Sequence, residues 1–563
     1  MLRLKLQTSL TILMVMSIAV TACAPQVSQP IATLPAAEEA APAAAVATEA
    51  PAPTEAPAPT VAPEPTVPPE PVTFTMAHPG PIRTMDAPVT WYGSTHYLTN
   101  LLYDCLIWRK SDSSGYDGQA AEKWESIDPT TWRFYLRKGL TFHNGEPLDA
   151  AAVKWNIDRV RTDEKLMVQP QWTFVQEVKV IDASTLEIIT GKPHAYFEHD
   201  ISFNGCQILP PKHYESVGGE AFALKPVGSG PYKLTEMKVN ATYVFEAWDD
   251  YWGGRPEVDR LVYQVIPEKA SQVAALLSGQ VDFIFEVSAP TTKMIAEVPG
   301  FQLSRMTSNA LDDLYLRGET KSGKMAEKYP GYQPITMDKR IRQAISHALD
   351  RTLLADIDSP GYPSLTRTSR YYPESHADKY GTPDAIKKWF DPELSKKLIK
   401  EAGFDPAAGK VPKLFFDAPV AQKSLAEVIA VMLKDVGFEV DLKILDAAAY
   451  TEQILGAGNN RDIMLTTLGG NPSLTPKFYT CEWKQANYNI CEPEWDKIGK
   501  EILVTVDRTK RLELYDKWQE YFLDTAYTVA VREIDRNYAV SDKFIYTARA
   551  DGWITPRDLK LNK

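Results

Sequence analysis

The chain of 563 residues has few cysteines, few histidines and no excess of positive charge. Five cysteines are too few for a disulfide framework to hold a fold of this length. Lysine and arginine total 61 against 73 aspartates and glutamates, for a net charge of -12. This balance argues against nucleic-acid binding, which needs a basic face. With 44% hydrophobic and 24% charged residues, most of the chain can bury a core, and its length predicts several structural units.

Motifs of common catalytic and metal sites are also missing. No HExxH, CxxC or GxSxG pattern occurs, so we predict no metal, no cofactor and no catalytic residue. Residues 318–324 match most of a phosphate-binding loop, but Met325 replaces the residue that would hold Mg²⁺, and a polar surface loop is predicted there. His143 and His347 are interpreted as structural residues rather than as metal ligands.

The first 23 residues have the features of an export signal. Arg3 and Lys5 precede the apolar run 10–20, which is too short to span a bilayer comfortably. The run ends in Val-Thr-Ala-Cys at 20–23, which resembles a bacterial lipobox, in which the cysteine is lipidated and becomes the mature N-terminus. Cys23 would then anchor an extracytoplasmic protein to a bacterial membrane. The alternative is a signal peptide cleaved nearby, with Cys23 incidental.

Residues 24–71 are almost wholly Ala, Pro, Glu, Thr and Val. Such a composition cannot bury enough apolar surface to fold, so we predict a disordered tether. The tether contains six glutamates and no lysine or arginine, and so contributes half of the net charge of -12. The remaining chain is therefore only mildly acidic.

Beyond residue 72, strands and helices are predicted in mixed order, which is typical of an α/β fold. No internal repeat is evident. The predicted strands are 74–77, 131–136, 186–189, 242–246, 261–266 and 462–467, with a turn at 142–145. The predicted helices are 97–107, 148–160, 271–277, 339–349, 392–402, 424–436 and 508–523, with Gly403 and Gly437 placed to end two of them.

Several sequence blocks, in a fixed order, resemble the signature of family 5 solute-binding proteins. These are the oligopeptide, dipeptide and nickel-type receptors of bacterial ABC importers. The matching blocks are 122–125, 132–145, 152–154, 228–234, 250–254 with Pro256, 274–282, 340–344 and 348–351. The resemblance covers nearly all of residues 72–563 and implies a monomeric receptor. Such a receptor passes a peptide or small-molecule ligand to an ABC permease.

The resemblance implies a two-lobed, type II periplasmic-binding-protein fold with an extra domain on the first lobe. The first lobe would comprise 72–115, 205–305 and 525–563, the extra domain 116–204, and the second lobe 306–524. Hinge strands are expected near 308–311 and 523–529. Closure on a ligand is the motion expected of this class.

The resemblance also implies which residues line the cleft. These are Trp91, Tyr92 and Gly93 in an early loop, Asp313 and Tyr315 on a hinge strand, and Leu468, Gly469, Gly470 and Asn471 after a second-lobe strand. Peptide receptors carry an aspartate for the peptide ammonium in that last loop, where this chain has Gly470. A buried ammonium without a carboxylate is costly. A sugar, a modified peptide or another polar organic solute is therefore as plausible a ligand as a plain peptide.

Two questions stay open at the level of sequence. Cys481 and Cys491 flank a short loop and are expected to pair, as in some dipeptide receptors, whereas Cys105 and Cys206 either pair or lie separately in the core. Two alternatives to a transport receptor are a secreted hydrolase that acts on peptides or glycosides through paired carboxylates and a sensory protein that binds solute without transporting it.

Overall fold

The computed structural model describes residues 70–563, except for 81, 83, 91–92, 113, 286, 318–332, 358–382, 447–448, 451–460, 470–475, 477–480, 482–491, 550–556 and 558. The predicted signal, the lipobox and nearly all of the tether lie outside the described residues, as does the loop 318–324. Chain contacts separate Met1–Pro68 from Pro69–Lys563, and the description below concerns the second unit.

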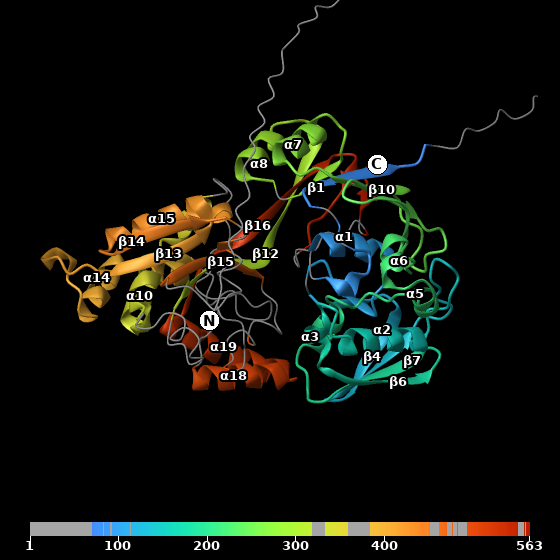
Figure 1. Cartoon of the computed structure of the whole chain (residues 1–563), viewed down its shortest axis with the longest axis horizontal. Coiled ribbons are helices and arrows are strands. Elements are labelled where there is room, and N and C mark those ends of the chain that lie inside the picture. The colour runs from blue at the N-terminus through green and yellow to red at the C-terminus, as the bar shows by residue number, and fades with distance from the viewer. Residues whose placement is uncertain are drawn as a thin grey trace, which may run out of the picture. The chain divides into compact units, whose positions relative to one another are not determined.

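A ten-stranded mixed sheet is the main element of the fold, with the order β14-β13-β15-β12-β16-β11-β1-β10-β9-β8. Its two longest strands, β12 and β16, pair antiparallel in the middle of the sheet, as Figure 1 shows. Its strands are β1 Thr73–His78, β8 Tyr232–Lys238, β9 Thr242–Ala247, β10 Arg260–Val265, β11 Phe283–Ile284, β12 Phe301–Leu316, β13 Lys413–Pro419, β14 Glu439–Leu445, β15 Ile463–Gly469 and β16 Thr528–Ser541.

A second, four-stranded antiparallel sheet has the order β4-β5-β7-β6 and packs against helix α2. Its core gathers buried residues from Cys105 to Ile208 and is separate from the cores of the large sheet. This sheet consists of β4 Ala121–Asp128, β5 Thr131–Leu136, β6 Val175–Asp182 and β7 Thr185–Thr190; two further strand pairs are β2 Ile107–Arg109 with β3 Tyr116–Gly118, and β17 Phe544–Ile545 with β18 Lys560–Leu561.

The helices cover the sheets, and several of them begin after an aspartate that caps the first turn. Asp149 accepts a hydrogen bond from the Ala152 backbone N–H at 2.9 Å, and Asp391 and Asp507 cap α14 and α19 in the same way. The helices are α1 Gly93–Leu102, α2 Ala150–Thr162, α3 Gln169–Trp172, α4 Phe197–Ile201, α5 Pro211–Val217, α6 Gly219–Leu224, α7 Lys269–Leu277, α8 Ala289–Ala296, α10 Lys339–His347, α11 Arg351–Asp356, α13 Pro383–Lys388, α14 Pro392–Glu401, α15 Lys423–Asp435, α18 Pro493–Val504 and α19 Arg508–Thr525.

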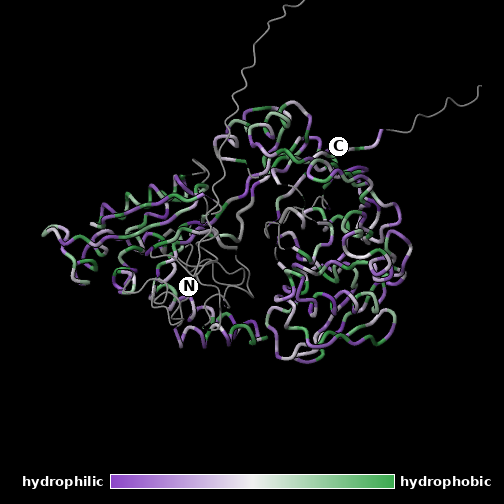
Figure 2. Tube along the Cα trace, in the orientation of Figure 1, coloured by the Kyte–Doolittle hydropathy of each residue, from purple (hydrophilic) through white to green (hydrophobic). Residues whose placement is uncertain are grey.

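Most predicted elements are confirmed within a few residues. The strand predicted at 131–136 is β5, and the helices predicted at 392–402 and 424–436 are α14 and α15. Both helices alternate hydrophilic and hydrophobic residues along the trace in Figure 2, as expected of helices with one buried face. Gly403 and Gly437 follow them with φ of 93° and 106°, the left-handed conformation expected of a helix end.

The helix predicted at 97–107 is wrong at its C-terminal end. Helix α1 stops at Leu102, and Ile107 opens strand β2. The distant loop 228–230 meets this end, where the Gly230 N–H donates to the Leu102 carbonyl oxygen at 2.8 Å. A Cβ added to Gly228 would lie 1.8 Å from that same oxygen. The glycine at 228 is therefore required by close backbone packing, and the packing ends the helix.

Candidate functional site

Strands β12 and β16 connect two separately packed parts of the large sheet. We call the point where both strands pass from one part to the other the crossing. On one side of it, Phe301–Thr307 pairs with Asp535–Ser541, beside the cores that contain β1 and β11. After it, Leu311–Tyr315 pairs with Thr528–Glu533, beside the core that contains α10 and α15. The register shifts between Thr307 and Leu311 and again between Asp312 and Asp313. The first irregularity falls at the crossover predicted near 308–311.

Beyond this irregularity the two faces of β12 differ in character. Leu314 and Leu316 are buried in the core under α10 and α15, whereas Tyr315 belongs to an aromatic cluster with α18 and α19. Because side chains alternate along a strand, Asp313 shares the face of Tyr315, and Asp312 shares the face of Leu314. Neighbouring carboxylates thus lie on opposite faces of the sheet, and both are fully buried.

Asp312 is held by a network of charged and polar groups. Its carboxylate accepts a hydrogen bond from Arg532 Nε at 2.9 Å and from Thr467 Oγ1 at 2.7 Å, and Gln422 also donates to it. Arg532 is buried as well, so the pair satisfies two charges inside the protein. These contacts give Asp312 a structural role and leave Asp313 as the carboxylate on the Tyr315 face.

An aromatic cluster covers the Tyr315 face. It joins β12 and β15 to α18 and α19, and it includes one residue of the segment between β7 and α4. The buried members are Tyr196, Tyr315, Met464, Trp495, Ile502, Tyr515, Trp518, Phe522 and Tyr527. Tyr315 is only 4% exposed, because the side chains of this cluster cover it and exclude solvent.

The loop expected to select the ligand begins later than predicted. Leu468 and Gly469 are strand residues of β15, paired with Leu311 and Ala310 of β12. The prediction that the strand ends at Thr467 is therefore wrong. The strand continues because β12 offers a pairing edge up to the irregularity. Gly470 and Asn471 lie outside the described residues.

The early loop is only partly described. Trp91 and Tyr92 lie outside the described residues, and Gly93 is the first residue of α1. That helix carries Leu98, Leu101 and Leu102 into the core of the first part of the sheet.

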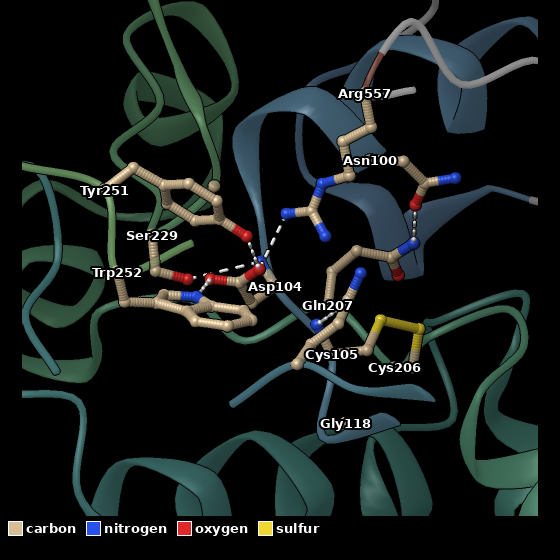
Figure 3. Close-up of polar contacts among 12 residues, drawn as sticks. Asn100, Asp104, Cys105, Gly118, Cys206, Gln207, Ser229, Tyr251, Trp252 and Arg557 are labelled. Carbon is tan, nitrogen blue, oxygen red and sulfur yellow. Dashed lines mark hydrogen bonds and ion pairs between the residues drawn. A yellow bond between two sulfur atoms is a disulfide. The ribbon is translucent and has the colours of Figure 1, made fainter. Parts of the chain in front are cut away.

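A polar cluster at the end of α1, drawn in Figure 3, was not predicted. The carboxylate of the buried Asp104 accepts hydrogen bonds from Tyr251 Oη at 3.1 Å, Trp252 Nε1 at 3.1 Å and Arg557 at 2.6 Å. Tyr251 also packs under the Arg557 guanidinium. Burial raises the pKa of Tyr251 far above its usual value, so the hydroxyl stays a donor. The sequence signal was the Tyr251-Trp252 pair, whose polar tips need partners when buried.

Beside this cluster, two buried amides share one hydrogen bond. Gln207 Nε2 donates to Asn100 Oδ1 at 3.2 Å, while Asn100 Nδ2 and Gln207 Oε1 have no hydrogen-bond partner. If the oxygen and nitrogen atoms of both amides were exchanged, one donor and one acceptor would still have no hydrogen-bond partner. The two amides therefore make the protein interior beside α1 more polar, and because each amide is neutral they do not favour a positive or a negative charge there.

The open question about the cysteines has a clear answer for one pair. Cys105 and Cys206, which are 101 positions apart in the sequence, form a disulfide next to Asp104 (Figure 3). Cys481 is also disulfide-bonded. Its expected partner, Cys491, lies outside the described residues, so that pairing stays a prediction.

The histidines that were interpreted as structural are packed against protein groups. His143 Nε2 lies 2.9 Å from the Gly230 carbonyl oxygen, and the Gly228 N–H donates to His143 Nδ1 at 3.2 Å. Burial lowers the pKa of His143 to about 4. His347 stacks on Trp389, and burial lowers its pKa as well. Across the described ranges, no three His, Cys, Asp or Glu side chains are grouped as metal ligands would be.

Comparison with known proteins identifies the family. The model for "Bacterial extracellular solute-binding proteins, family 5 Middle" matches residues 116–489. The chain belongs to family 5 of the extracellular solute-binding proteins. Family 5 proteins act outside the cytoplasm with ABC importers. None of the helices in the described part of the chain has the length and apolar character needed to cross a bilayer.

Named relatives and a solved structure agree with this assignment. The chain is 24% identical to the glutathione-binding protein GsiB of Pectobacterium atrosepticum over 409 residues, which is 70% of this chain and 76% of the relative. It is 23% identical to the dipeptide-binding protein of Escherichia coli over 479 residues, with coverage of 77% and 84%. Both relatives are binding proteins, so the hydrolase alternative gains no support from them.

The solved structure of the ABC transporter substrate-binding protein CtaP from Listeria monocytogenes matches with a TM-score of 0.75 at 22% identity, covering 87% of this chain and 99% of that one. The predicted fold class is thereby confirmed: the chain has the two-lobed, type II periplasmic-binding-protein fold of mixed α/β content. The exact boundaries of lobes and extra domain stay predictions.

Proposed function

We propose that this family 5 protein is a lipid-anchored receptor that captures a peptide or another polar organic solute by hinge closure and delivers it to an ABC permease. The observation that carries the proposal is the crossing of β12 and β16. These two strands connect separately packed cores and lose their regular register where they cross. A two-stranded connection with an irregularity can bend more easily than a continuous sheet.

The relatives suggest the class of solute. One is named for binding glutathione and another for binding dipeptides. Both ligands are small and polar, and both contain peptide-type amide bonds. We therefore propose a ligand of peptide-like polarity, with a sugar or another polar organic solute as the alternative that Gly470 leaves open.

We propose that the ligand meets both lobes near the crossing. Asp313 and Tyr315 would face it from β12, and Leu468 to Asn471 from the end of β15 and the following loop. Trp91, Tyr92 and Gly93 would face it from the entry to α1. In support, Asp313 lies on the Tyr315 face of the sheet, away from the Asp312–Arg532 pair. A buried carboxylate on such a face is suited to an ammonium or a hydroxyl group of a solute.

The anchor and the second disulfide complete the proposal. Lipidation of Cys23 would hold the receptor at the membrane surface, and the residues of 24–71 would act as a spacer that lets it reach a permease. A bridge between Cys481 and Cys491 would restrict the loop after β15 and contribute about 2–3 kcal/mol by limiting the unfolded chain. We propose a monomer without catalytic activity.

Mass spectrometry under native conditions tests the proposal. The full chain, purified from its host, should carry a solute at one molecule per chain, and removal of the solute by unfolding and refolding should lower the melting temperature. Adding it back should restore the melting temperature, and the recovered solute should have an unchanged mass. Release of a product of lower mass during incubation would instead indicate a hydrolase. A protein that neither carries nor is stabilised by any solute would contradict the receptor role.

A further inference from the structure

A contact outside the strand pairing of β12 and β16 joins the segment that links β7 to α4 with helices α18 and α19. The Ala195 N–H donates to the Leu503 carbonyl oxygen at 3.1 Å, and the Tyr196 hydroxyl donates to the Tyr515 hydroxyl at 3.0 Å. Tyr196 and Tyr515 are 5% and 1% exposed, so the bond between them is shielded from water. A shielded hydrogen bond is worth more than an exposed one.

The two sides of this contact belong to different cores. Phe197, next to Tyr196, is buried in the core of the four-stranded sheet and stacks on Trp132 with ring centroids 4.7 Å apart. Tyr515 packs against Trp518 of α19 and belongs to the same aromatic cluster as Phe522 and Tyr315. Tyr196 therefore leaves the core of its own segment and inserts into the aromatic cluster of the other side.

Each partner is held rigidly by its own side. His194 and His199 both contact the Asp200 carboxylate at 2.9 Å, and Trp124 donates to Glu198 at 2.6 Å. These bonds fix the segment that presents Tyr196.

On the other side, Arg511 donates to the carbonyl oxygens of Thr505 and Val506 at 2.9 Å and places its guanidinium 5.0 Å from the Tyr196 ring centroid. A cation over an aromatic face adds attraction to the hydrogen bonds. A contact between two preorganised surfaces costs little ordering entropy when it forms.

We propose that Tyr196 and Tyr515 form a latch that holds the lobes closed and so sets solute affinity without touching the solute. The proposal rests on hinge closure as the function of the molecule. A contact that exists only in the closed form lowers the free energy of that form, and any solute that binds the closed form then binds more tightly by the same factor. The two tyrosines are positioning residues, since they act through the closure equilibrium.

Hydrogen exchange of the Ala195 amide measures this equilibrium directly. Its hydrogen bond crosses the contact, so the amide is exposed when the lobes separate. The Asp200 amide is the internal reference, because it donates to the Tyr196 carbonyl oxygen at 2.9 Å within the same segment. Lobe opening exposes Ala195 alone, whereas local unfolding of the segment exposes both amides.

The experiment uses the full chain, stripped of solute, with residue-resolved exchange. Tyr196→Phe and Tyr515→Phe each remove one hydroxyl and should speed Ala195 exchange by roughly five-fold, the effect of one net hydrogen bond, with Asp200 unchanged. The double variant should add little, because both single changes remove the same bond. Tyr232→Phe is the matched control: its hydroxyl donates to the Val258 carbonyl oxygen at 3.2 Å inside one core, so Ala195 exchange should not change.

The outcomes separate the latch from the receptor role. If Ala195 exchanges faster than the core amide of Thr190 but no tyrosine variant alters it, the lobes open and the latch proposal is wrong. Acceleration of Ala195 and Asp200 together would also overturn the latch. If Ala195 exchanges only as slowly as Thr190 in every variant, the lobes do not separate, and hinge closure itself is wrong.

Discussion

Adjacent aspartates on β12 show how one residue step separates a structural role from a proposed binding role. Asp312 pairs with Arg532 and accepts from Thr467, while Asp313 points to the opposite face of the strand. Both are fully buried, so burial alone does not distinguish them. The face that each side chain occupies does distinguish them, and it depends on the register of β12 against β15 and β16.

The two aspartates form a matched pair for mutation. Asp312→Asn leaves the buried Arg532 without its counter-charge and should lower the free energy of unfolding by about 3 kcal/mol, measured by urea denaturation. Asp313→Asn should weaken binding of an ammonium-bearing solute roughly ten-fold or more, measured by calorimetry. Equal losses of stability in both variants, with affinity intact, would make Asp313 a structural residue instead.

At the level of elements, the chain is held together by loops that meet from distant parts of the sequence. The turn 142–145 docks on the loop 228–230 through His143, whose two ring nitrogens contact the backbone of Gly228 and Gly230. The Gly228 N–H needs an unprotonated Nδ1 as its acceptor. Burial lowers the pKa of His143 to about 4, and the Gly228 bond favours the same neutral form.

This docking predicts a pH dependence of stability. In the unfolded chain the histidine takes up a proton below its ordinary pKa of about 6.5, whereas in the folded protein it stays neutral down to about 4. The contribution of neutral His143 to the free energy of unfolding is therefore complete above about pH 6.5 and is lost as the pH falls towards 4. The loss is on the order of 3 kcal/mol in total. The decrease in the urea midpoint between pH 7.5 and pH 4.5 should be smaller for His143→Gln than for the wild-type chain. Equal decreases in both proteins would show that His143 does not contribute to the pH dependence of stability.

Local pattern predicted most of the elements because their own residues determine them. The alternation in Thr131–Leu136 and the glycines after α14 and α15 depend only on near neighbours. The end of α1 and the extension of β15 were mispredicted, since each depends on a partner far along the chain, namely Gly230 and Ala310.

The same distance limit applies to the candidate site. Asp104 and Arg557 meet across 453 positions, and Tyr196 and Tyr515 across 319. Composition and spacing carry no signal for such pairs. Asp313 and Tyr315 came instead from resemblance to a family, which carries the topology of known folds into the sequence.

For the whole molecule, the fold and family are established, and we propose that its two lobes close on the solute by a hinge motion. The connection made by β12 and β16 is the proposed hinge, and the Tyr196–Tyr515 contact is the proposed latch. A solute between the lobes would stabilise the closed form only by its extra affinity for that form.

Solution scattering from the full chain, first stripped of solute and then titrated with the solute that co-purifies, tests this motion most directly. If the lobes close on the solute, the radius of gyration should fall as solute is added, level off at one molecule per chain, and rise again when the solute is removed. A radius of gyration that stays constant while the same solute binds at full occupancy would contradict it.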